Sequence, residues 1–240
     1  MSKIHFVYPL KKSSVGDCEE FKYSLRCLES NVKDDFDVTV IGYQPKWLDI
    51  SKVNIIRYPQ CAYASKNTLL AFEIAANMFN DFVFMHDDFF INQKVTLEDL
   101  KTVLYLQDFN DIKTFGSRIF QQLLKILFEE VKQKGLYGLN YATHSPYYME
   151  SKYVKEVIEE FNLWDKEKFA SFEGYYYNYI RKEKEAVKMD KYKYGMYRQE
   201  VFDKNRADKS RFLNFDENGM VFGMFDYIKE KYNKKSIFEK

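Results

Sequence analysis

A ten-residue apolar run near the middle of this 240-residue chain indicates its fold class. The run extends from Phe82 to Ile91 and is rich in aromatic residues, as is typical of a strand buried on both faces of a parallel sheet. It is interrupted at Asp87 and Asp88, two adjacent carboxylates, and then becomes apolar again. Ligands of open α/β sheets bind beyond the carboxyl ends of the strands, so these acids mark a candidate ligand site. The alternative interpretation is a solvated polar turn.

Short apolar runs alternate with helical patterns before this strand. The expected strands cover 4–8, 38–42 and 53–57, and the expected helices cover 18–30 and 69–78. We expect the first strand to end at Pro9, because proline cannot donate to a sheet ladder. The alternation predicts an α/β fold, with a central mixed sheet flanked by helices.

The pattern after the acids is mainly helical. Expected helices begin at Thr96 and cover 118–134, 151–161, 172–181 and 222–232, and expected strands cover 139–143 and 212–215. In 118–134 the apolar stripe consists of Ile119, Leu123, Ile126, Leu127 and Val131. We expect residues 1–240 to form one domain with a helical insertion and C-terminal part.

Composition limits the classes of partner and compartment. The chain has 37 Lys and Arg against 36 Asp and Glu, so its charge gives no reason to expect nucleic-acid binding. No apolar run is long enough to span a bilayer and there is no signal-peptide pattern, so we expect a cytosolic protein. Cys18, Cys27 and Cys61 lack metal-like spacing and are expected to be free structural thiols. The lysine-rich stretch 182–193 is expected to be a solvated surface; the alternative is peripheral contact with an anionic membrane surface.

Several motifs along the chain together resemble a known family. They are Val7-Tyr8-Pro9, the helical segment 20–28, Asp87-Asp88-Phe89-Phe90, Thr143-His144-Ser145-Pro146 and the closing segment 227–232. In this order they resemble a family of small bacterial and phage glycosyltransferase-like proteins. They are also distantly similar to the Stealth group of capsular sugar-phosphate transferases.

This resemblance implies a GT-A-like fold that binds a nucleotide-sugar donor with Mn²⁺ or Mg²⁺. Asp88 would bind the metal, and Asp87 would bind the metal or the donor. His86 stands where the family's Asp-x-Asp or Asn-Asp-Asp motif has another residue. It is either an additional ligand or a buried core residue.

Four further residues are implied to contact the donor. Tyr8 and Pro9 lie where GT-A enzymes receive the nucleoside base. Lys66 and Asn67, at the start of a helix, fit donor binding through charge and the helix N-terminus. A solvated lysine and a helix-capping asparagine are the alternatives for this second pair.

His144 and Asp216 are the candidate catalytic residues. His144 follows an expected strand and would complete the metal shell, contact phosphate or act as a general base; the alternative is a structural histidine. Asp216 would act as a base or a metal contact; the alternative is an exposed turn.

The expected function is therefore metal-assisted transfer of a sugar from a nucleotide-sugar donor to a hydroxyl of a cell-surface glycan or related acceptor. Two alternatives stay open. One is a Stealth-type sugar-1-phosphate transferase, and the other is a non-catalytic nucleotide- or carbohydrate-binding module.

Overall fold

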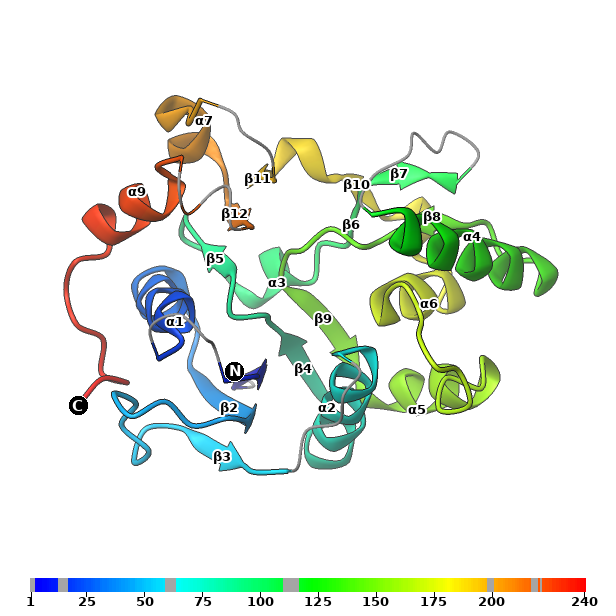
Figure 1. Cartoon of the computed structure of the whole chain (residues 1–240), viewed down its shortest axis with the longest axis horizontal. Helices are drawn as coiled ribbons and strands as arrows, with labels where there is room; N and C mark the ends of the chain where they lie inside the picture. Colours follow the sequence, from blue (N-terminus) through cyan, green and yellow to red (C-terminus); the bar gives the residue numbers. More distant parts are fainter. Residues whose placement is uncertain are drawn as a thin grey trace.

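The computed structural model describes residues 3–12, 17–58, 64–109, 117–197, 201–216, 220 and 222–240. Its main sheet has five strands in the order β3-β2-β1-β4-β9 (Figure 1). The first four are parallel to one another, and β9 is antiparallel to β4. The strands are β1 Ile4–Leu10, β2 Phe36–Gly42, β3 Asn54–Ile56, β4 Asp81–Phe84 and β9 Tyr147–Glu150. The prediction of an α/β fold with a mixed sheet is confirmed.

Helices flank this sheet. Helix α1 (Glu19–Asn31) connects β1 to β2, and α2 (Ala64–Met78) connects β3 to β4. The two crossovers run in opposite directions along the sheet, so right-handed connections place the helices on opposite faces (Figure 1). Helices α5 (Ser151–Glu160) and α6 (Phe172–Tyr179) pack beside α2.

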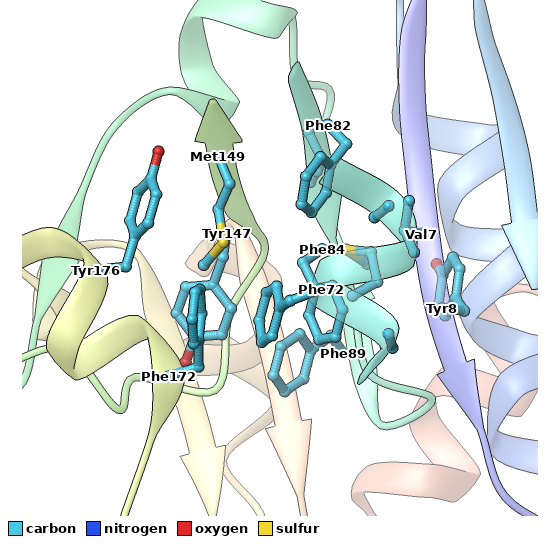
Figure 2. Close-up of a cluster of buried hydrophobic side chains, with 14 of the residues drawn as sticks. Val7, Tyr8, Phe72, Phe82, Phe84, Phe89, Tyr147, Met149, Phe172 and Tyr176 are labelled. Carbon is cyan, nitrogen blue, oxygen red and sulfur yellow. The ribbon is translucent and has the colours of Figure 1, made fainter. Parts of the chain in front are cut away.

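An aromatic stack connects α2 to the sheet and to α6. The Phe72 ring of α2 lies between Phe84 of β4, at a centroid distance of 3.8 Å, and Phe172 of α6, at 4.2 Å (Figure 2). All three side chains are buried. Burial of large aromatic surface at stacking distance is strongly stabilising, so this stack is a centre of the core.

A second, three-stranded sheet has the order β11-β12-β5. Its strands are β5 Phe89–Ile91, β11 Lys193–Met196 and β12 Phe212–Phe215, with β12 parallel to β11 and antiparallel to β5. Because β5 follows β4 after only residues 85–88, this short segment joins the two sheets (Figure 1).

The remaining elements surround these two sheets. Among the described residues they are α3 Leu97–Leu100, β6 Leu104–Tyr105, β7 Gln107–Asp108, α4 Arg118–Gln133, β8 Leu139–Asn140, η2 Lys182–Lys184, β10 Val187–Lys188, η3 Met189–Lys191, α7 Lys204–Lys209 and α9 Met224–Lys231. Strand β6 pairs with β10, and β7 pairs with β8.

One predicted strand is placed differently by the structure. The expected strand 139–143 is reduced to β8, which pairs with β7 outside the main sheet. The backbone bends around it, because Gly138 has a φ of 91° and His144 a φ of 48°, both in the left-handed region. The fifth strand of the main sheet is instead β9, which the sequence analysis did not identify.

Two details of the predicted elements are also wrong. Strand β1 does not end before Pro9 but continues to Leu10. Strand β4 pairs with β1 only at Phe6 and Val7, so beside Pro9 there is no β4 residue that would need the N–H that proline lacks. In α4 the predicted stripe is too broad, since Ile119 and Ile126 are 62% and 46% exposed. The buried face of α4 consists of Leu124, Leu127 and Val131.

The described cysteines agree with the expectation of free thiols. Cys18 and Cys27 are both buried and unbridged, whereas Cys61 lies outside the described residues. None of the helices in the described ranges is long and apolar enough to cross a membrane.

Candidate functional site

The two aspartates lie on the turn between the sheets. The Phe89 backbone N–H donates to the His86 carbonyl at 3.2 Å, so Asp87 and Asp88 are the central residues of a β-turn. Just before it, the Met85 N–H donates to the Val7 carbonyl at 2.9 Å, which fixes the turn to β1. The acids therefore stand at the carboxyl end of β4, as the sequence predicts, and both are half-buried.

The electrostatics of this turn disfavour negative charge. Burial raises the pKa of Asp87 to about 6, and repulsion from Asp88 adds to the increase. Burial also raises the pKa of Asp88 to about 6, against the opposing effects of an Asn214 hydrogen bond and the Lys193 charge. A bound cation would relieve this penalty.

Glu20 is a third acid near the turn, and the sequence analysis did not single it out. Ser24 lies one turn further along α1, where its Oγ donates to the Phe89 carbonyl at 2.6 Å and accepts from the Tyr8 hydroxyl at 3.0 Å. Glu20 therefore lies on the helix face directed at the turn. Burial, followed by repulsion from Asp87 and Asp88, raises the pKa of Glu20 to about 7. An acid in the first turn of a helix interacts favourably with the helix dipole, so this position alone gives no sequence signal of a site.

The chemistry of these acids fits a hard divalent cation whose shell is completed by ligand oxygens. Mg²⁺ is commonly held in proteins by one or two carboxylates together with water and substrate phosphate. Among the residues that the structure describes, no group of three or more His, Cys, Asp or Glu side chains is arranged as a protein-only metal site. Asp87 and Asp88 supply the carboxylates that such a shared site requires.

His86 is part of the aromatic packing behind the acids. Its ring meets the Phe84 ring edge-on at 5.5 Å and lies 4.8 Å from the Phe89 ring. Burial lowers the pKa of His86, so the imidazole is neutral at neutral pH. These contacts favour the core interpretation of His86.

A cleft of about 850 Å³ opens near the turn, between the second sheet and the segment around α4. Both candidate catalytic residues, His144 and Asp216, line it. The other lining residues are Leu106, Ser117, Phe120, Ala142, Thr143, Met189, Asp190, Lys193, Gly195, Tyr197 and Arg206.

His144 is held in an uncommon backbone conformation at the edge of this cleft. Its backbone N–H donates to the Tyr147 hydroxyl at 2.8 Å, and that hydroxyl donates to Glu173 at 3.3 Å. These bonds stabilise the left-handed φ of 48°. The surrounding protein, Lys193 and His86 lower the pKa of the His144 imidazole, so its ring is neutral and can accept a hydrogen bond.

A chain of hydrogen bonds joins the cleft to the aspartates. Lys193 Nζ donates to the Thr143 carbonyl and, at 2.6 Å, to the Tyr197 hydroxyl. That hydroxyl donates to Asn214 Oδ1, and Asn214 Nδ2 donates to Asp88 Oδ2 at 2.7 Å. None of Lys193, Tyr197 and Asn214 is a predicted site residue. The signal in the sequence is Asn214, a polar residue inside the apolar run 212–215, and the structure buries it fully in β12.

Lys193 also corrects the expectation for the lysine-rich stretch 182–193. The whole stretch is expected to be solvated, but Lys193 is only 2% exposed. Strand β11 begins at Lys193 and directs its side chain under the cleft.

The structure gives the four predicted donor-binding residues other surroundings. Tyr8 is fully buried, so its side chain supports α1 rather than presenting a surface for a base. Pro9 is half-buried in β1. Lys66 Nζ donates to the Leu163 carbonyl at 3.2 Å and to that of Trp164.

Asn67 lies inside α2 rather than at its first described residue, and its carbonyl accepts from the Tyr58 hydroxyl at 3.1 Å. Neither Lys66 nor Asn67 lines the cleft that holds His144. The structure therefore places His144 and Asp216 on one cleft and connects Asp88 to it through Asn214 and Tyr197, although neither Asp87 nor Asp88 is a lining residue of that cleft. It leaves Lys66 and Asn67 apart from this group. No protein-family model matches this sequence, and a comparison with curated proteins finds no similar protein.

Proposed function

We propose that this protein is a GT-A-like glycosyltransferase. It would transfer a sugar from a nucleotide-sugar donor to a hydroxyl of a cell-surface glycan or related acceptor. The observation that carries the proposal is the position of Asp87 and Asp88. They lie at the carboxyl end of a parallel strand, and hydrogen bonds through Asn214 and Tyr197 connect Asp88 to a cleft lined by His144 and Asp216. The parallel order β3-β2-β1-β4 supports a nucleotide site at the same edge of the sheet.

In this proposal the two aspartates of the turn share one task, and the base is a different residue. Asp87 and Asp88 would hold a divalent cation, which when bound neutralises charge on the diphosphate leaving group. A base beside the acceptor would take up the proton of the attacking hydroxyl.

Asp216 is our candidate for this base. His144 and Asp216 are both exposed on the same cleft, and the lowered pKa of His144 removes the advantage in basicity that an ordinary imidazole has over a carboxylate. His144 would then orient the acceptor or the donor as a neutral hydrogen-bond partner.

A panel of nucleotide sugars tests the proposal. We expect one of the UDP-, GDP-, CMP- or dTDP-sugars to raise the melting temperature in the presence of Mn²⁺. A ligand at a hundredfold excess over its Kd stabilises by about 2.7 kcal/mol, which corresponds to roughly 5–10 °C for a domain of this size. The shift should be lost in Asp88→Asn and kept in Asp226→Asn, whose carboxyl on α9 is 72% exposed. If no nucleotide sugar shifts the wild-type protein with Mn²⁺, the proposal is wrong.

The products then identify the reaction. Release of a nucleoside diphosphate with a new glycosidic bond would establish glycosyl transfer. Release of a nucleoside monophosphate with a new phosphodiester would establish sugar-1-phosphate transfer by the same residues. Binding without turnover of any offered acceptor or of water would leave a binding module.

A further inference from the structure

The surroundings of Lys193 point to the charge of the ligand in the cleft. The residue is 2% exposed, lines the cleft, and donates hydrogen bonds to two neutral groups, the Thr143 carbonyl and the Tyr197 hydroxyl. Within the described part of the chain, no carboxylate forms an ion pair with it, although Asp88 is near enough to act on its charge. Burial lowers the pKa of Lys193 to about 7, against the attraction of Asp88, and an anionic ligand beside the amine would favour its charged ammonium form.

The local sequence provides room for this arrangement. Lys193, Gly195 and Tyr197 follow one another at every second position, so they share one face of β11 and its continuation. A Cβ on Gly195 would lie 2.5 Å from the Tyr197 ring. Because Gly195 has no side chain, the Tyr197 ring can pack against the strand at this position, and the Tyr197 hydroxyl contacts Lys193 Nζ. Two of the three ammonium donors are then used, and one is left for the cleft.

The site favours a phosphate group over other anions. Asp190 and Asp216 also line the cleft and repel any anion, so an anion there needs the positive charge of Lys193 together with that of a cation held by Asp88. A phosphate has several acceptor oxygens, which permits one oxygen to contact Lys193 while others contact such a cation. The chain through Tyr197 and Asn214 keeps these two contact points in a fixed relation.

We propose that Lys193 is a buried anion-binding residue of the cleft, which Arg206 also lines, and that the Lys193 ammonium donates a hydrogen bond to a phosphate oxygen of the ligand. This inference rests on the proposed function in one respect: that function identifies the phosphate as part of the donor diphosphate.

Titration calorimetry with inorganic pyrophosphate, with and without Mg²⁺, tests the contact directly. We expect Lys193→Met to weaken pyrophosphate binding by about 10- to 100-fold, the effect of losing one charge-assisted hydrogen bond. Lys191→Met is the matched control, because Lys191 is exposed in the neighbouring η3 and its removal should leave the affinity unchanged. Equal pyrophosphate affinity in folded Lys193→Met and wild type would overturn the inference. So would a wild type that binds no pyrophosphate under either condition.

A second variant covers the case in which Lys193→Met does not fold. Lys193→Gln keeps an N–H donor for the Thr143 carbonyl but removes the charge, and it should lose affinity to a similar degree. Sulfate and glucuronate, offered in parallel, identify the anion. Stronger binding of either than of pyrophosphate would replace phosphate by that group and contradict the inference.

These outcomes are separable from those of the proposed function. Pyrophosphate binding that depends on Lys193, without any effect of nucleotide sugars, would leave a phosphate site and reject the transferase. A nucleotide-sugar effect that persists in Lys193→Met would keep the transferase and reject the role of Lys193.

Discussion

Burial and neighbouring polar groups have opposite effects on the pKa of Asp88. Burial raises its pKa to about 6, while Asn214 donates to its Oδ2 at 2.7 Å and Lys193 attracts its charge. A carboxyl whose pKa is higher in the folded than in the unfolded state binds its proton more tightly when folded. Its ionisation therefore lowers the free energy of unfolding as pH rises from about 4 to about 6, and the loss is complete above that range.

Replacement of this carboxyl should remove that pH dependence. Relative to wild type, we expect Asp88→Asn to gain about 1–2 kcal/mol of stability between pH 4 and pH 6.5, since the amide has no charge to bury. Urea denaturation of both proteins at the two pH values measures the difference. Asp226→Asn on the surface of α9 should show no comparable change. A constant difference between Asp88→Asn and wild type across this range would mean that the pKa of Asp88 is not raised.

The sequence predicts some of the site residues but not the contacts that connect them. Asp87 and Asp88 are visible because two charges interrupt an apolar run, which is a local pattern. Lys193 and Asn214 acquire their roles only when β11 and β12 pair and place them beside a turn more than a hundred residues earlier. One lysine among many carries no local mark of burial, so a sequence pattern cannot separate Lys193 from its solvated neighbours.

The helices and strands were predictable from the sequence where a periodic apolar pattern was bounded by residues that typically begin or end such elements. Helix α3 begins after Thr96 as expected, and its capping box explains why: the Thr96 side chain accepts from the Asp99 N–H and the Asp99 side chain accepts from the Thr96 N–H. Strand β9 was missed because it begins directly after the irregular segment around His144 and passes into α5 without a break. Its antiparallel pairing with β4 depends on tertiary contact and has no separate signal in the sequence.

The aromatic stack on α2 gives a prediction for the packing of elements. Phe72→Ala should lower the free energy of unfolding by about 3–5 kcal/mol, because the cavity would lie between β4 and α6 and neither can collapse into it. Met78→Ala, at the end of the same helix, is the control, since Met78 is 45% exposed and its loss should change stability by less than about 0.5 kcal/mol. Chemical denaturation compares the two. A similar small loss in both variants would show that α2 does not depend on the stack.

A buried ion pair connects parts of the whole molecule that are distant in sequence. Arg26 of α1 binds Glu239 through two hydrogen bonds of 2.7 Å, Nε to Oε1 and Nη2 to Oε2. The two side chains are only 10% and 4% exposed. Near them the Asp49 N–H donates to the Phe238 carbonyl at 2.8 Å, so the segment at 238–240 is fixed to both α1 and the loop after β2.

Removal of one partner of this ion pair should lower the free energy of unfolding more than removal of both. Glu239→Met leaves the Arg26 charge buried and should cost about 3–5 kcal/mol, whereas adding Arg26→Met to it should recover much of that loss. A double-mutant cycle based on urea unfolding measures the coupling between the two residues. If the single and double losses simply add, the ion pair does not couple them.

The segment 85–88 belongs to neither sheet, yet it is the direct covalent connection between β4 and β5. On one side the Met85 N–H holds it to β1, and on the other Asn214 of β12 holds it through the carbonyl and carboxylate of Asp88. A shift of one sheet relative to the other would therefore displace the two aspartates. The positions of their carboxylates depend on how the two sheets lie relative to each other, and a ligand bound to both carboxylates would hold the sheets in that arrangement.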